Sequence, residues 1–225
     1  MFATVTKSDF QLQQDVQREM RWDTRVGPTE VGVEVDKGIV TLAGTVDSYA
    51  TKFAAIEAVH KVVGVLDVAD DLTVHYPGSG KKTDAEIASA VRHSLEWDAF
   101  VADQRIKSTV SDGWVTLEGD VEYLREKEDA ERAVRYLTGV KGVWNRIVVR
   151  ATKAEPEVVR KAIEEALERR AEKDADRINV EVQGGTVTLS GRVGSWLERN
   201  AILRSVEHAP GVTSVSSKLR VDPFL

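Results

Sequence analysis

Apolar residues recur along this chain with two spacings, one typical of helices and one typical of strands. The same order of these spacings occurs three times. Each copy opens with apolar residues at i, i+4 and i+8, a spacing that places them on one face of a helix. These residues are Leu12, Val16 and Met20, then Ile87, Val91 and Leu95, then Val159, Ile163 and Leu167. The spacing predicts an amphipathic helix at the start of each copy.

Alternation of apolar and polar residues follows each helix and predicts two β-strands joined by a hairpin turn. A second helix is expected near residues 50–63, 125–138 and 197–209, and a third strand near 68–74, 143–149 and 215–221. We therefore predict an α+β fold of three tandem αββαβ units, each a small three-stranded mixed sheet with two helices packed on one face. The expected domains are residues 8–76, 83–150 and 154–222.

The second strand of each unit carries the pattern G-x-V-T-L-x-G-x-V, and a Gly-Val pair follows 20 residues after its second glycine. The recurring glycines are Gly38, Gly44 and Gly64, then Gly113, Gly119 and Gly139, then Gly185, Gly191 and Gly211. In each set the first glycine predicts a hairpin turn and the third predicts the end of the second helix. The middle glycine predicts a bulge or a close approach of the helix. Because no helix begins at these strands, the glycines do not form a phosphate loop.

The repeated sequence resembles the BON domain of bacteria. Unit 2 is the most similar, with Asp112-Gly-Trp-Val-Thr-Leu-Glu-Gly119 and Gly139-Val-Lys-Gly-Val-Trp-Asn-Arg-Ile147. Units 1 and 3 have Asp70 and Ser217 where unit 2 has Asn145. The resemblance implies non-catalytic modules like those of periplasmic osmotic-shock proteins, which attach to phospholipid or other envelope surfaces and act in stress protection or as chaperones.

Charge and composition narrow the functional classes. The net charge is −6, and it is −6 for residues 8–76, −3 for 83–150 and −1 for 154–222. An acidic protein without a basic stripe is a poor nucleic-acid binder, because phosphate neutralisation supplies most of that affinity. The chain has no cysteine, which excludes disulfides and thiolate zinc sites.

The expected location follows from the start of the chain. Residues 1–10 show no basic region followed by an apolar core, so no secretory signal is predicted. No apolar run reaches the roughly 18 residues that a transmembrane helix needs. We therefore expect a cytoplasmic protein without a transmembrane segment.

Reactive side chains do not recur at matched positions. The four histidines have no histidine counterpart in another unit, and the common hydrolase, nucleotide-binding, zinc and calcium motifs are absent from the sequence. We expect no enzyme activity, no cofactor and no metal site. The sequence leaves the oligomeric state open.

One candidate binding site lies at the start of the second helix of unit 3. Trp196 and Leu197 stand there between Arg192 and Arg199, and Tyr49 and Leu124 occupy the position of Trp196 in the other units. The simplest interpretation of this position is a hydrophobic staple or core residue. The alternative is an exposed apolar tip that inserts among lipid headgroups, where tryptophan is favoured.

A second candidate is the pair Trp114 and Trp144, which occurs only in unit 2. These tryptophans fit either packing between units or an edge that faces a ligand. The leading functional hypothesis is a binding protein that attaches to phospholipid or envelope surfaces and is linked to osmotic or other stress. Its acidic charge opposes strong attraction to anionic lipid. The alternative is a protein-interaction scaffold or chaperone-like protein that binds protein partners.

Overall fold

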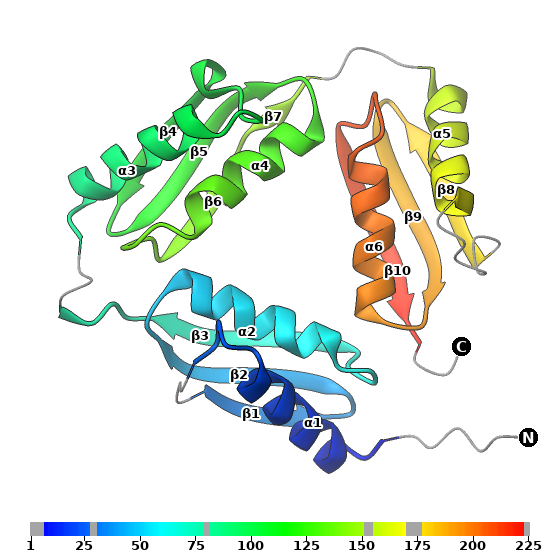
Figure 1. The fold of residues 1–225 in the computed structure, drawn as a ribbon. Coiled ribbons are helices and arrows are strands. Elements are labelled where there is room, and N and C mark those ends of the chain that lie inside the picture. Colours follow the sequence, from blue (N-terminus) through cyan, green and yellow to red (C-terminus); the bar gives the residue numbers. More distant parts are fainter. Residues whose placement is uncertain (1–6, 28–30, 79–81, 151–154, 170–176, 223–225) are drawn as a thin grey trace, which may run out of the picture. The chain divides into compact units, whose positions relative to one another are not determined.

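The structure, a computed structural model, describes residues 7–27, 31–78, 82–150, 155–169 and 177–222. It contains three α+β units of the predicted αββαβ order, and in each unit two helices cover one face of a small sheet (Figure 1). The predicted fold class is therefore confirmed. Each unit is described here by itself.

Unit 1 consists of α1 (Asp9–Trp22), β1 (Val31–Asp36), β2 (Ile39–Val46), α2 (Tyr49–Lys61) and β3 (Asp67–Val74). β1 pairs with β2 in antiparallel orientation, and β2 pairs with β3 in parallel orientation. A capping box starts α1, because the Ser8 hydroxyl accepts the Gln11 N–H while the Gln11 side chain accepts the Ser8 N–H.

Unit 2 consists of α3 (Asp84–Trp97), β4 (Ile106–Ser111), β5 (Trp114–Val121), α4 (Leu124–Arg135), β6 (Gly142–Asn145) and β7 (Val148–Val149). β5 pairs with β4 in antiparallel orientation and with β6 and β7 in parallel orientation. The third strand is predicted as one segment over 143–149, and the structure interrupts it at residues 146 and 147. Asn145 is turned to donate a 2.8 Å hydrogen bond to the Lys127 carbonyl of α4, which favours this local break.

Unit 3 consists of α5 (Pro156–Arg169), β8 (Ile178–Gln183), β9 (Thr186–Val193), α6 (Trp196–Glu207) and β10 (Ser214–Val221). Proline at the first position of α5 suits a helix start, because the missing N–H has no partner there in any helix. β9 is the central strand, between β10 and β8, as β2 and β5 are in their sheets.

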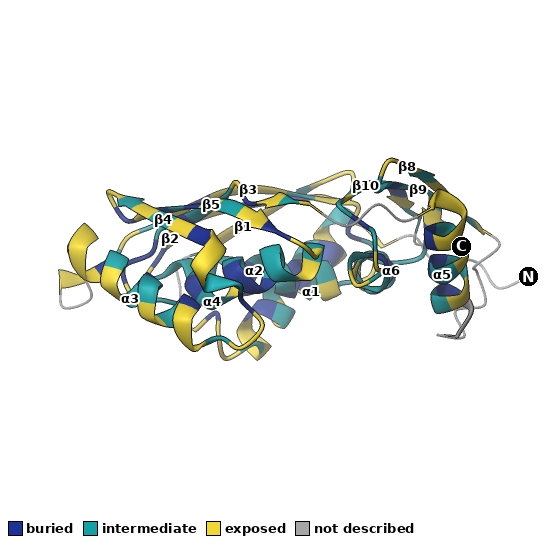
Figure 2. Ribbon diagram, turned by 90° about the horizontal axis from the view of Figure 1, so that it is seen from above, coloured by how far each residue is buried: buried dark blue, intermediate teal, exposed yellow. Residues whose placement is uncertain are grey.

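The core of each unit lies between its sheet and its helices, and the alternation along the strands decides which side chains enter it (Figure 2). In the central strand of unit 2, Val115, Leu117 and Val121 are buried, while Trp114 and Glu118, of the other parity, are exposed. The three residues that open each helical pattern are buried in all three units. Within each unit, the described helices lie on one side of the sheet only, and the other side carries the residues of the other parity (Figure 1).

The middle glycine of the repeated pattern is explained by a close backbone approach. Gly119 has φ of 145°, and a Cβ atom there would collide with the carbonyl oxygen of Arg105. Gly191 stands in the same relation to Arg177. The approaching group is thus the backbone just before the first strand, which in unit 2 is the end of a short 3-10 helix, Asp103–Arg105. The prediction of a close approach by the α-helix was wrong.

Candidate functional site

The end of unit 2 at which both helices meet the strands gathers exposed aromatic side chains. We call it the junction end and define it by residues 97–105 and 122–125. α3 leads there through the 3-10 helix into β4, whose first residue is opposite Gly119 near the end of β5, and α4 begins soon after β5 ends. An ion pair of 3.0 Å between Arg105 Nη1 and Glu122 Oε1 joins the two segments.

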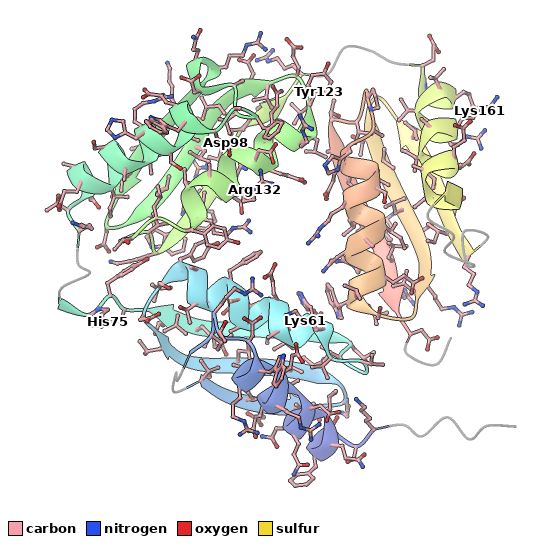
Figure 3. The ribbon with its side chains drawn as sticks, in the orientation of Figure 1. Lys61, His75, Asp98, Tyr123, Arg132 and Lys161 are labelled. Carbon is pink, nitrogen blue, oxygen red and sulfur yellow. The ribbon has the colours of Figure 1, made fainter. Side chains whose placement is uncertain are left out.

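Three aromatic side chains at this junction end point into solvent. Trp97 is 87% exposed, Phe100 is 58% exposed and Tyr123 is 55% exposed. The Arg125 guanidinium lies 5.1 Å from the centre of the Phe100 ring, a cation–π distance. Figure 3 labels Asp98 and Tyr123, one residue from each of the two segments. Large apolar side chains exposed together in this way are unusual for a surface without a binding role.

Sequence reasoning missed these residues as a site, although a signal for Trp97 was present. The buried face of α3 consists of Ile87, Val91 and Leu95, at intervals of four. Trp97 follows Leu95 by two residues, which places it away from the buried face. The same is true of Trp22 in unit 1, which is 83% exposed.

The corresponding segment of unit 1 is built from charges instead. Asp23 follows α1, and its carboxylate accepts hydrogen bonds from Arg25 at 2.8 Å and from Lys61 at 3.1 Å. Arg25 also pairs with Glu57 at 2.8 Å. Hydrogen bonds from the Arg25 side chain, followed by that from Lys61, hold the pKa of Asp23 well below its usual range. At neutral pH this part of unit 1 is therefore a closed ion-pair network.

The predicted site of unit 3 lies at the start of α6, which Trp196 begins. Trp196 is half-buried, whereas Leu197 is 70% exposed and Arg192 is exposed. The Arg199 guanidinium lies 4.6 Å from the centre of the Trp196 ring. Trp196, Leu197 and Arg199 thus lie at one helix start, and Arg192 lies before it at the end of β9. Tyr49 and Leu124, which occupy the same position in the other units, are also half-buried.

The structure brings the second predicted pair together. Trp114 on β5 and Trp144 on β6 stack with ring centres 5.3 Å apart and planes 23° apart. They are 41% and 54% exposed and lie on the face of the sheet away from the helices. The two tryptophans form a separate aromatic surface from the junction end of the same unit.

Other site classes find little support in the described part of the chain. No group of three or more His, Asp or Glu side chains that could hold a metal ion occurs among the described residues. An open cavity of about 360 Å³ beside the 3-10 helix of unit 2 is lined by polar groups, chiefly Asp103, Arg105, Glu122 and Glu126. Among the described helices, none is both long and apolar enough to cross a membrane.

Comparison with known proteins agrees with the resemblance seen in the sequence. The BON domain matches residues 8–76, 83–151 and 157–223. The chain is 31% identical over 121 residues to osmotically-inducible protein Y of Escherichia coli (strain K12). This alignment covers 52% of the chain and 60% of that protein.

Two solved structures of CdsD, a structural protein of the type III secretion system of Chlamydia trachomatis, align with most of the chain. Both are 14% identical to it with a TM-score of 0.27. The alignments cover 93% and 96% of this chain, and 91% and 100% of the CdsD chains. A score this low adds nothing to the description of the fold.

The expected cytoplasmic location is wrong. It relied on the lack of a recognisable export signal in residues 1–10, whereas the three BON matches and the likeness to osmotically-inducible protein Y point to a periplasmic or envelope protein. The predicted resemblance is confirmed, since the BON matches together cover nearly all of the chain. The chain therefore belongs to the BON domain family and carries three BON domains in tandem.

Proposed function

We propose that this protein is a non-catalytic envelope protein that attaches to phospholipid surfaces, and that it acts in osmotic or other stress. The observation that carries the lipid proposal is the exposed aromatic cluster at the junction end of unit 2, Trp97, Phe100 and Tyr123. The link to osmotic stress rests on the likeness to osmotically-inducible protein Y. The non-catalytic role rests on family membership and on the lack of reactive side chains that recur between units.

The chemistry of this cluster suits the headgroup layer of a membrane. Tryptophan and tyrosine are favoured there because an apolar ring and a polar tip can both be satisfied. Transferring one large side chain out of water contributes about 1.5–3 kcal/mol. Trp97 and Phe100 together could therefore hold the protein at a membrane weakly and reversibly.

Charge argues for a neutral lipid surface. At the same junction end three acidic residues, Asp98, Asp103 and Glu122, outnumber Arg105 and Arg125, and unit 2 carries a net charge of −3. Acidic groups oppose approach to anionic lipid by about as much as basic groups favour it, roughly 1 kcal/mol each close to the surface. Insertion of apolar side chains would thus dominate, with little gain from anionic lipid.

The start of α6 provides a second contact of the same kind. Leu197 is 70% exposed and follows Trp196, whose ring faces the Arg199 guanidinium at 4.6 Å. Unit 3 is the least acidic unit, with a net charge of −1 over residues 154–222. We expect a smaller contribution from this tip than from the three exposed rings of unit 2, because only one large apolar side chain is fully presented.

Vesicle flotation tests the proposal. The full chain is mixed with vesicles of phosphatidylcholine and phosphatidylethanolamine, with or without phosphatidylglycerol. We expect flotation with both, differing less than about threefold, and a loss of roughly tenfold or more in W97A/F100A. The matched control is W114T/W144S, which also removes two exposed aromatic rings from unit 2 but leaves the junction end intact.

Two results would overturn lipid binding at the junction end. One is a folded wild-type protein that floats with neither kind of vesicle. The other is an equal loss in W97A/F100A and in W114T/W144S. If vesicles are not bound but an aggregating client protein is kept soluble, and W97A/F100A loses that ability, the chaperone-like alternative would replace the lipid proposal.

A further inference from the structure

A glycine in the neighbouring strand, Gly142, leaves space for one of the stacked tryptophans of unit 2. β5 and β6 pair so that Trp114 is opposite Gly142 and Thr116 is opposite Trp144. A Cβ atom on Gly142 would overlap the six-membered ring of Trp114. The indole of Trp114 therefore lies directly against the backbone of β6, with Trp144 stacked beside it at 5.3 Å.

Gly142 has no conformational reason to be glycine. Its φ is not in the left-handed region that favours glycine, and it lies within a regular strand. Glycine in a strand interior weakens the strand and is typical of a place where another group approaches closely. Here that group is the Trp114 indole, so the missing side chain of Gly142 leaves the space in which the ring lies against the strand.

The fold does not require this arrangement, since the other two units lack it. The positions of Trp114, Gly142 and Trp144 are occupied by Ile39, Asp67 and Ala69 in unit 1, and by Thr186, Ser214 and Ser216 in unit 3. In unit 3 the first two of these residues share a hydrogen bond of 2.9 Å. Unit 2 alone presents two large rings on this face, which points to a binding role.

The surroundings of the two rings supply hydroxyl groups. Across the antiparallel pair, Ser111 is opposite Trp114 and Thr109 is opposite Thr116. Ser111 and Thr109 are exposed, and all three hydroxyl residues lie on the same face as the rings. Hydroxyls can both donate and accept hydrogen bonds, so they suit a ligand that does the same.

The charged side chains around the rings are paired with one another. Lys141 Nζ lies 2.9 Å from Asp112 Oδ1, and Arg146 Nη1 lies 3.9 Å from Glu118 Oε1. The rim therefore offers opposite charges in balance, which gives little attraction to a phosphate or to a cation. An uncharged ligand is favoured.

We propose that Trp114, Trp144 and the hydroxyls of Thr109, Ser111 and Thr116 bind a neutral, β-linked glycan. A pyranose ring has faces of C–H bonds and a rim of hydroxyls, so it can lie on an indole while its rim hydrogen-bonds to the strand hydroxyls. In β-1,4-linked glucose or N-acetylglucosamine the substituents are equatorial, which leaves those faces flat and open to stacking.

Other ligand classes fit this surface less well. A stable protein interface buries at least about 1,000 Å², whereas the apolar surface here consists of two side chains bounded by hydroxyls and ion pairs. Insertion into lipid would carry Glu118 and Asp120 of the same face toward the membrane, at a desolvation cost. Nucleic acid is disfavoured by the net charge of −6.

The test is a titration of the full, nitrogen-15-labelled chain with chitohexaose, cellohexaose and maltohexaose, followed through the five tryptophan indole N–H signals. We expect the Trp114 and Trp144 signals to shift with the two β-linked sugars, with a dissociation constant of about 1 mM. Maltohexaose, which is α-linked and curved, should bind several-fold more weakly.

Three variants use residues that unit 3 carries at the same positions, namely W114T, W144S and G142S. Each should weaken binding at least about tenfold. G142S is the sharpest, because it keeps both indoles and only displaces the Trp114 ring. W97A/F100A should bind the sugars as the wild type does, which separates this site from the lipid contact.

The glycan proposal would be overturned if none of the three sugars at 10 mM, about ten times the expected dissociation constant, moved the Trp114 and Trp144 signals. It would also be overturned if W114T/W144S, still folded, lost vesicle flotation instead, since the pair would then be a lipid contact. Equal binding of maltohexaose would overturn the preference for a flat β-linked chain. The sugar titrations do not depend on whether the junction end binds lipid.

Discussion

Units 1 and 2 end their first helices with the same Trp-Asp pair, yet the residues that follow give the two ends different chemistry. In unit 1, Asp23 is held by Arg25 and Lys61. In unit 2 the equivalents of Arg25 and Lys61 are Phe100 and Tyr136, which are 58% and 53% exposed. The same fold thus carries an ion-pair network around Asp23 in unit 1 and exposed aromatic side chains in unit 2.

The difference shows what the common backbone leaves free to vary. In both units the Asp after the helix accepts a backbone N–H two residues later, Arg25 at 3.1 Å and Phe100 at 2.9 Å. This turn is the structural part of the motif. The side chains that follow it are not needed for the turn, so they can either stabilise the unit or face a partner.

Removal of Asp23 is expected to have the largest effect on this contrast. D23A would leave Arg25 and Lys61 without their shared acceptor, and we expect unit 1 to lose about 2 kcal/mol of stability, since hydrogen bonds to charged groups contribute about 1.5–3 kcal/mol. D98A removes only the turn bond and should cost unit 2 about 1 kcal/mol. Hydrogen exchange of peptides from each unit would measure both. Equal losses would show that the ion pairs of unit 1 add nothing to the turn.

A smaller effect is expected when the two exposed tryptophans are compared. Trp22 and Trp97 are 83% and 87% exposed, so exposure alone does not distinguish them. W97A should lower vesicle binding about fivefold, because a ring that is only partly inserted contributes roughly 1 kcal/mol, less than the ~1.5–3 kcal/mol of full transfer. W22A should lower it less than about twofold, because its neighbours are charged. Similar losses in quantitative flotation would remove the functional contrast between the two ends.

The smallest expected effect is a loss of stability of unit 1 at acid pH. Because the folded pKa of Asp23 is depressed, its contribution is present above the unfolded pKa of about 3.8 and is lost as the pH falls below that value. Between about pH 5 and pH 3, wild-type unit 1 should lose more protection from hydrogen exchange than unit 1 of D23N, which has no carboxyl to titrate. The comparison uses exchange rates corrected for their intrinsic pH dependence. Identical pH profiles would show that the ion pairs of Asp23 do not stabilise unit 1.

Much of the fold follows from local patterns in the sequence. The i, i+4, i+8 residues and the capping boxes at Ser8 and Thr83 predict the first helices, and the alternating strands predict the buried face. The interruption of the third strand in unit 2 does not follow, because it accompanies a contact between the Asn145 side chain and the Lys127 carbonyl of α4. That contact exists only once the crossover helix is packed on the sheet.

The candidate sites, like the fold, could be predicted from the sequence only in part. Exposure of Trp97 could be predicted from its place outside the buried helical face. The stacking of Trp114 on Trp144 could not, because it depends on the parallel register that places Gly142 beside Trp114. A hairpin turn fixes an antiparallel register from the sequence, but the register across a helical crossover is set by packing. The pattern therefore indicated the residues without showing that they meet.

The space left by Gly142 also has a consequence for the differences between the repeats. Any side chain at that position would overlap the Trp114 ring where it now lies, so this placement of the ring is compatible only with glycine at position 142. In units 1 and 3, which have Asp67 and Ser214 there, a tryptophan at the opposite position would have to take another orientation. A single β-carbon thus separates the strand that allows this stacked pair from the corresponding strands of the other two units.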